Sequence, residues 1–221
     1  MTSEYFPWSK ENFVILCFGV ITEKSCYSFN GTGLTYIGDC NYGHNNGGLT
    51  KYDGNLLTSG GAYGLIWRYY RPIYGNQKTE ILKIDESKPI SWSVVEQDFE
   101  FTLGEYIMDH SLVTVESTGV NEEYVLLIGG INDEFDELEK VFKFTGTWFA
   151  FGKLNKPRMY HNSIYWNGAV YVIGGIYNWD DKNTKIEIWN VKDSPDKFKT
   201  KENWPELFDW YRLHIFIVQD S

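Results

Sequence analysis

The chain has 221 residues, a formal net charge of -10 and a sequence pI near 4.9. Hydrophobic residues make up 43% of it, which is enough apolar material for a sizeable core and excludes an intrinsically disordered chain. The acidic balance argues against nucleic-acid binding, and no apolar run approaches the ~20 residues of a membrane-spanning helix, so membrane insertion is not expected.

The first expected element is an inner strand at residues 13–17, which runs into Phe18 and Gly19. Similar short apolar runs occur three more times, and each of these ends in a glycine doublet. A glycine pair that ends a strand and recurs about every 50 residues is typical of a propeller built from repeated blades. The doublets are Gly60 and Gly61, Gly129 and Gly130, and Gly174 and Gly175.

The interval between the first two doublets is longer than the next, which indicates an insertion at residues 62–77. Because this segment shows no alternation of period two, we expect a loop without secondary structure of its own, and such loops are often functional. Arginine, tyrosine and tryptophan dominate many interfaces, so the insertion is a candidate binding loop; the alternative is a cap that packs over a blade edge. Its candidate partner-binding residues are Trp67, Arg68, Tyr69, Tyr70, Arg71 and Tyr74.

An alternating stretch follows each doublet after a polar loop, at residues 79–84, 140–144 and 185–189. Alternation predicts a half-buried strand, here the third of each blade. A tryptophan follows every stretch, and these aromatic side chains are expected to fill the wedge between neighbouring blades. The residues are Trp92, Trp148 and Trp204, with Tyr36 as the counterpart in the first copy.

The most specific motif is the run Lys156, Pro157, Arg158, Met159, Tyr160, His161, Asn162 and Ser163, which a second apolar run and a doublet follow at residues 167–175. It resembles the joint between two blades of the kelch-repeat β-propeller family, whose superfamily contains the galactose oxidase propeller. The resemblance implies an all-β fold and a role in protein recognition.

Counting strands predicts one domain, residues 1–221, with about four four-stranded blades at residues 12–40, 42–103, 108–156 and 158–210. A last strand at residues 214–219 would lie beside residues 13–18 and complete the first blade, which removes two exposed strand edges. The alternative is a fragment of a larger propeller.

The four histidines recur at one point of the repeat: His44, His110 and His161 precede the doublets, and His214 opens the last segment. Repetition favours structural hydrogen-bond donors near the blade joints, with a ring of histidines on one face as the alternative. No nucleophile elbow, phosphate loop or zinc motif occurs. We therefore expect no enzyme, no cofactor and no metal; calcium at Asp180, Asp181 and Asn183 is a weaker alternative.

The segments after the doublets are expected to share one face of the propeller, and two of them are acidic. This predicts a non-catalytic module that binds a protein with a basic surface; the alternative is a carbohydrate-binding or vestigial oxidase-type propeller. The candidate residues beyond the insertion are Asp133, Glu134, Asp136, Tyr177, Trp179, Asp180 and Asp181.

Three cysteines leave the compartment open. Cys17 is expected to be a small buried hydrophobe, whereas Cys26 and Cys40 would bridge in an oxidising compartment. Asn30, Gly31 and Thr32 form a glycosylation sequon, which matters only in a secreted chain. Since no signal peptide is visible, the cytoplasm is favoured, and secretion is the alternative if the chain is a fragment.

Overall fold

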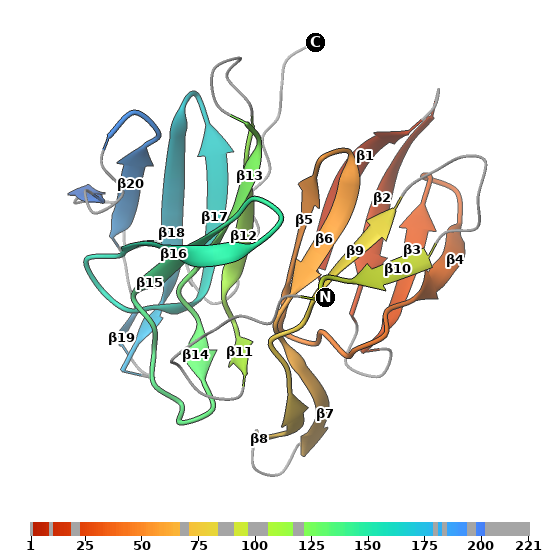
Figure 1. Ribbon diagram of the computed structural model, residues 1–221, viewed down its shortest axis with the longest axis horizontal. Helices are drawn as coiled ribbons and strands as arrows, with labels where there is room; N and C mark the ends of the chain where they lie inside the picture. The colour runs from red at the N-terminus through yellow and green to blue at the C-terminus, as the bar shows by residue number, and fades with distance from the viewer. Residues whose placement is uncertain are drawn as a thin grey trace.

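The regular secondary structure is entirely β wherever the computed structural model describes the chain, which is residues 2–8, 11–18, 23–66, 71–83, 91–96, 106–116, 122–178, 181–182, 185–193 and 198–201. The strands form four antiparallel sheets of four main strands each, arranged as the blades of a propeller (Figure 1). The predicted all-β propeller with four four-stranded blades is therefore confirmed. No helix long and apolar enough to cross a membrane occurs in these ranges.

The blades follow one another along the chain. Blade 1 contains β1 (Thr2–Trp8), β2 (Glu11–Cys17), β3 (Ser25–Phe29) and β4 (Leu34–Asp39), and blade 2 contains β5 (Gly48–Tyr52), β6 (Asn55–Ser59), β9 (Thr79–Lys83) and β10 (Ser91–Val94). Blade 3 contains β12 (Ser111–Val115), β13 (Tyr124–Ile128), β15 (Lys140–Phe144) and β16 (Trp148–Lys153). Blade 4 contains β17 (Met159–Trp166), β18 (Ala169–Tyr177), β20 (Ile186–Asn190) and β21 (Lys199–Lys201).

The first strands of the blades are neighbours in chain order: β5 packs against both β1 and β12, and β12 packs against β17. Within the described part of the chain, the first strands of blades 4 and 1, β17 and β1, do not pack against each other as extensively as these three pairs do. The predicted third strands are β9, β15 and β20, each in third place of its blade.

Blade 1 begins earlier than its sequence pattern indicates. The strand β2 pairs with β1 along its whole length, from Thr2↔Cys17 to Trp8↔Glu11, and with β3 on its other edge. Both edges of β2 are therefore taken by described strands, and residues 214–219, which were expected beside residues 13–18, lie outside the described residues. The sequence pattern misses β1 because it contains Pro7, a residue that lacks a ladder donor and is confined to edge strands or strand ends.

The insertion after the first doublet has secondary structure, contrary to expectation. It forms a hairpin of β7 (Ala62–Ile66) and β8 (Arg71–Gly75), which projects from the lower end of the molecule in Figure 1. The strands contain Gly64, Pro72 and Gly75, residue types that are depleted in strands, so no alternation marks them. Residues 67–70, between the two strands, lie outside the described residues.

Apolar clusters fill the wedges between neighbouring blades. Trp92 is 8% exposed in the cluster shared by blades 1 and 2, and half-buried Trp148 packs 5.0 Å from the Phe144 ring beside blade 2. Tyr36 does not have the predicted role, because it is 55% exposed on β4, the outermost strand of blade 1. Among the described tryptophans, the most buried is instead Trp189, on the third strand of blade 4. Trp204 lies outside the described residues.

Main-chain hydrogen bonds join equivalent positions of successive blades. The Asp109 N–H donates to the Asn46 carbonyl at 2.8 Å, and the Tyr160 N–H donates to the Asp109 carbonyl at 3.0 Å. Asn46, Asp109 and Tyr160 all have positive φ, at 59°, 55° and 56°. Such a conformation costs energy for a non-glycine residue, so its threefold recurrence indicates that the joint requires it.

Candidate functional site

The glycine doublets occupy places where no side chain fits. Gly129 and Gly130 have φ values of 60° and 98°, and a Cβ on Gly129 would lie 2.7 Å from the Arg158 carbonyl oxygen. A Cβ on Gly130 would lie 2.6 Å from the Met108 carbonyl oxygen. Glycine at both positions therefore lets the second strand of blade 3 end in close contact with the backbone of two joints, the one before β12 and the one before β17.

Two histidines pack onto the doublet of the preceding blade. A Cβ on Gly60 would meet the His110 ring at 2.7 Å, and one on Gly129 would meet the His161 ring at 2.8 Å. The His110 Nε2–H donates to the Ser59 carbonyl at 3.0 Å, while His161 Nε2 lies 2.9 Å from the Ser111 hydroxyl. Burial lowers the pKa of His110 to about 3 and that of His161 well below its usual value. The predicted structural role fits both residues; His214 lies outside the described residues.

His44 occupies a different place in the repeat, which corresponds to Arg158 of blade 4. Each of these two basic residues lies before the first strand of its blade and pairs with a buried glutamate on the third strand. His44 Nε2 lies 3.0 Å from Glu80, and Arg158 Nη2 lies 2.6 Å from Glu187. Each also donates to the first carbonyl of its own doublet, at Gly60 (2.6 Å) and Gly174 (3.1 Å).

An asparagine three residues before each cation completes the pair. The Asn155 backbone and side-chain amides donate to Glu187 at 2.6 and 2.9 Å, and those of Asn41 donate to Glu80 at 2.9 and 2.7 Å. The two joints therefore use the same Asn-x-x-cation arrangement around a carboxylate. Sequence reasoning missed it because the glutamates lie 30 or more residues downstream, within alternating strands where they look like solvent-facing positions.

Both ring nitrogens of His44 face acceptors, the Gly60 carbonyl and the Glu80 carboxylate. The Gly60 carbonyl can only accept, so Nδ1 donates to it, while Nε2 lies 3.0 Å from a carboxyl oxygen of Glu80. Burial of Glu80 acts to raise the pKa of its carboxyl, but hydrogen bonds from His44 and from the Asn41 and Tyr42 amides outweigh it, and the pKa lies below its ordinary value. His44 and Glu80 thus form a buried, hydrogen-bonded pair.

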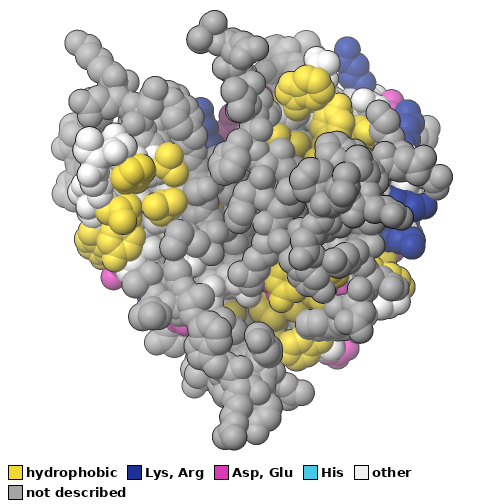
Figure 2. Space-filling model, turned by 180° about the vertical axis from the view of Figure 1, so that it is seen from behind, with side chains coloured by type: hydrophobic (Ala, Val, Ile, Leu, Met, Phe, Trp, Pro, Cys, Tyr) yellow, Lys and Arg dark blue, Asp and Glu magenta, His cyan; other side chains and the backbone are white. Residues whose placement is uncertain are grey.

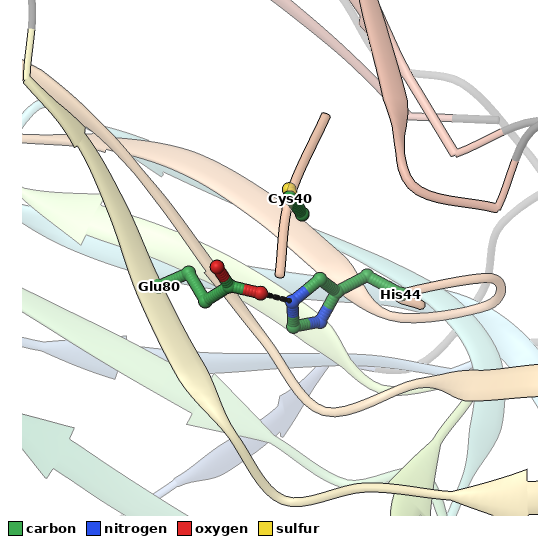
Figure 3. Close-up of side chains that lie close together, drawn as sticks. All are labelled: Cys40, His44 and Glu80. Atoms are coloured by element: carbon green, nitrogen blue, oxygen red, sulfur yellow. Dashed lines mark hydrogen bonds and ion pairs between the residues drawn. The ribbon is translucent and has the colours of Figure 1, made fainter. Parts of the chain in front are cut away.

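Cys40, His44 and Glu80 are also the one described cluster with metal-ligand chemistry, since their ligand atoms lie within 4.8 Å of one another and all three are buried (Figure 3). The cluster does not fit a metal well. Glu80 already bonds to three residues, and the two His44 ring nitrogens are taken by the Gly60 carbonyl and by Glu80. In blade 4 the place of Cys40 belongs to Leu154, a buried apolar residue, so Cys40 is best explained as part of the core. We assign no metal here.

Blade 3 replaces the salt bridge with apolar residues. Ile107 takes the place of the cation, and Phe142 takes that of the glutamate, because Leu127↔Phe142 is the cross-strand pair equivalent to Thr58↔Glu80. Ile107 and Phe142 are both buried in the cluster between blades 2 and 3. In blade 3, both members of the polar pair are therefore replaced together by apolar residues.

The described segments after the three doublets lie at one end of the molecule, which we call the doublet face: residues 62–66, 71–75, 131–139, 176–178 and 181–182. Figure 1 shows the β7–β8 hairpin, β14 (Ile131–Asn132) and β19 (Asp181–Lys182) at this end. Ala62, Ile131 and Ile176 each follow a doublet directly, and all three belong to one apolar cluster. β11 (Ile107–Met108) pairs with β14 and contributes Met108 to the same cluster. The doublet face thus has a continuous apolar base.

The acidic turn of blade 3 is ordered on this face. Glu134 and Asp136 are exposed and Asp133 is half-buried. Buried Asn132 accepts hydrogen bonds from the Glu134 N–H at 3.1 Å and the Asp136 N–H at 2.8 Å through its Oδ1 atom. Asn132 is a residue that the sequence pattern did not single out, although an asparagine that opens a turn often bonds the backbone two residues on.

The remaining predicted binding residues are only partly described. Tyr177 is half-buried, with the Lys156 ammonium 5.7 Å from its ring centre. The backbones of Arg71, Tyr74 and Asp181 lie in β8 and β19, on the doublet face. The residues outside the described ranges are Trp67, Arg68, Tyr69, Tyr70, Trp179 and Asp180.

The disulfide differs from the predicted one. Cys17 and Cys26 lie directly opposite each other on β2 and β3 and form a bridge, with Cα atoms 4.2 Å apart. Cys40 is a free, buried thiol, so the expected Cys26–Cys40 bridge is wrong. Spacing along the chain cannot show which cysteines face each other; the register of the hairpin decides it.

The chain is similar in fold to a solved structure titled "Structure of YjhT", with a TM-score of 0.61 and 15% sequence identity. The match covers 81% of this chain and 52% of that chain, so this chain spans about half the length of that protein. At this identity the likeness supports the propeller fold alone. No protein-family model matches the chain, and no curated protein matches it in sequence.

Proposed function

We propose that this chain is a non-catalytic protein-interaction module of the kelch type, which binds a partner with a basic surface through the doublet face. The observation that carries the proposal is the convergence of the three post-doublet segments on one apolar base, with exposed acidic side chains above it. Such a surface combines an ordered platform with charge that attracts cationic partners.

The kelch assignment rests on the blade joints. Arg158, His161 and the doublet at Gly174 and Gly175 form one unit, in which the arginine holds the doublet carbonyl and the histidine packs against it. The resemblance of residues 156–175 to kelch-repeat joints supports the same assignment. Protein recognition is what that family resemblance implies.

A non-catalytic role is supported by the state of the titratable groups at the joints. His44, Glu80, Arg158 and Glu187 are occupied by structural hydrogen bonds, and His110 and His161 are buried against glycines. A general base must reach the proton that it removes, and these groups are buried in the joints between blades.

The test is selection of binders from a random peptide library on immobilised wild-type protein. We expect basic peptides to be enriched. The double variant Glu134→Lys with Asp136→Lys should bind them about tenfold more weakly at low salt, because two charges of the interface are reversed.

The matched control is Glu116→Lys with Glu122→Lys, which makes the same charge change at exposed residues beside the β12–β13 connection, away from the doublet face. It should bind the selected peptides as the wild type does. Equal loss in both variants would show that net charge alone attracts the peptides. Ligands found on a glycan array but not in the peptide library would favour the carbohydrate-binding alternative.

A further inference from the structure

We propose that Asn30 is an N-glycosylation site and that its glycan covers the outer face of the β3–β4 hairpin. Asn30, Gly31 and Thr32 form the single Asn-x-Ser/Thr triplet of the 221-residue sequence. Such a triplet is an acceptor only where a surface loop meets the glycosylating machinery of the secretory pathway.

The structure places the triplet where a bulky adduct fits. It forms the turn between β3 and β4, and Asn30, Gly31, Thr32 and Gly33 are all exposed. A Cβ at Gly31 or Gly33 would meet nothing within 4 Å, so the surroundings of the turn are open.

The hydrogen bonds of the turn leave the acceptor atom available. Asn30 Oδ1 accepts from the Thr32 hydroxyl at 2.8 Å, from the Thr32 N–H at 3.1 Å and from the Gly33 N–H at 3.2 Å. All three bonds use the oxygen, so Nδ2 is not occupied by any of them. The threonine hydroxyl that the triplet requires is in contact with the asparagine amide.

A second observation points to the same compartment. The Cys17–Cys26 disulfide lies in the same sheet, between the strand that begins this hairpin and β2. Disulfides persist in oxidising compartments and are rare in the cytosol, and N-glycans are added to chains that enter the oxidising secretory lumen. The two features are independent in sequence and in chemistry.

The hairpin also carries an apolar surface that a glycan would shield. Phe29, Leu34 and Tyr36 are 37%, 62% and 55% exposed, and the pairs Phe29↔Leu34 and Tyr27↔Tyr36 place all four side chains on one face. β3 and β4 lie at the right of Figure 1. Figure 2, which is seen from behind, shows hydrophobic side chains gathered on the same side of the molecule, at the left of that view.

A glycan is the occupant that this face favours, because its attachment point is the adjoining turn. β4 pairs only with β3 among the described strands, and an exposed apolar edge strand is an aggregation hazard. The apolar faces of the first sugars can pack on the Tyr36 ring, and the rest of the glycan keeps other strands away from the edge.

The transfer balances without a redox step. Asn30 Nδ2 forms a bond to the anomeric carbon of an oligosaccharide carried on a polyprenyl diphosphate. The bond from that carbon to the phosphate oxygen breaks, the polyprenyl diphosphate leaves with the electron pair, and Nδ2 releases one proton. The host oligosaccharyltransferase catalyses the step.

The test directs the full chain into the secretory pathway of a eukaryotic cell and examines the secreted protein by peptide mass spectrometry. Peptide N-glycosidase converts a glycosylated asparagine to aspartate, which labels the site. The wild type and Thr32→Ser, which keeps the hydroxyl, should carry the label at residue 30. Asn30→Gln and Thr32→Val should lose it completely.

The third-to-fourth-strand turn of blade 3 provides a matched control, because Thr145, Gly146 and Thr147 are exposed and Thr145→Asn completes a triplet there. This change is made in the Asn30→Gln background and shows that the host modifies such a turn. Unmodified Asn30 in secreted wild-type protein overturns the proposal.

Light scattering tests the shielding. Asn30→Gln should self-associate at concentrations where the glycosylated wild type is monomeric, and adding Leu34→Ser and Tyr36→Ser should reverse this. If Asn30→Gln stays monomeric at the same concentrations, the glycan does not cover an adhesive face.

Discussion

The residue that stands three positions before the histidine-or-glycine joint position at the start of each blade differs from blade to blade, and its partner on the third strand changes with it. The pairs are His44 with Glu80, Ile107 with Phe142, and Arg158 with Glu187. A buried charge without its counter-ion is costly, whereas an apolar pair of similar volume is tolerated. The exchange of both members together in blade 3 is what this asymmetry predicts.

Removing one member of the blade 4 pair should therefore be more harmful than replacing both. Arg158→Ile leaves the Glu187 carboxylate buried and should lower the free energy of unfolding by about 3–5 kcal/mol. The double variant Arg158→Ile with Glu187→Phe, which copies the apolar pair of blade 3, should recover part of this loss in urea denaturation. If the double variant loses the sum of the two single losses, the residues are energetically independent.

The buried histidines make stability depend on pH. The pKa of His110 is lowered to about 3 in the folded protein from 6.5, so the unfolded chain binds a proton at a higher pH than the folded one does. The free energy of unfolding should therefore fall as pH is lowered below 6.5. His110→Gln should reduce this slope between pH 6.5 and 4.5, above the range where Glu80 begins to contribute. Parallel curves for wild type and variant would contradict the prediction.

At this scale the sequence identified the recurrence of histidines but not that His44 differs from the others. Distance along the chain to the next doublet cannot separate them, because the hairpins between vary in length. The cross-strand register does: His161↔Gly174 is a pair, and His44 lies several residues before the strand that pairs with its doublet.

Among the elements, those with regular alternation were predictable and those with interruptions were not. The third strands β9, β15 and β20 follow the expected stretches closely. The strand β1 and the β7–β8 hairpin contain proline or glycine, and their pairing depends on partners distant from the local pattern. Tertiary pairing decides these elements.

The β2–β3 pair should be held by its disulfide. Thiol titration of the unfolded protein without reductant should report one free thiol, that of Cys40, of the three cysteines. Cys17→Ser with Cys26→Ser should lower the free energy of unfolding by about 2–3 kcal/mol, the chain-entropy value for so short a loop. Cys40→Ala, which forms no bridge, serves as the comparison. Three free thiols would show that the bridge does not form.

At the scale of the whole molecule, the glycine doublets are places where one blade lies in close contact with the joint to the next. Gly129→Ala should push the new methyl group against the Arg158 carbonyl and the His161 ring of blade 4. Gly146 also has a positive φ, 93°, but nothing lies within 4 Å of a Cβ there. Gly146→Ala should therefore cost only the conformational strain, about 1–2 kcal/mol, and Gly129→Ala more, in urea denaturation. Equal losses would mean that the joint relaxes freely.

The propeller architecture was predictable because paired glycines, apolar runs and alternating stretches recur together. The doublet face followed from the same repetition, since equivalent segments must emerge at one end of equivalent blades. What the sequence did not indicate is the paired exchange of charges between joints, because its members are far apart in the chain and meet only after the blades have formed.

The main-chain bonds that link Asn46, Asp109 and Tyr160 have a consequence for descent. Neither atom of such a bond belongs to a side chain. Asparagine, aspartate and tyrosine can therefore occupy the equivalent position in different blades while the distance between the blades stays the same. The joints between blades therefore tolerate substitution of their side chains. The shape of the propeller can therefore stay the same while the residues at these positions differ, and a solved structure with 15% sequence identity to this chain has a similar fold.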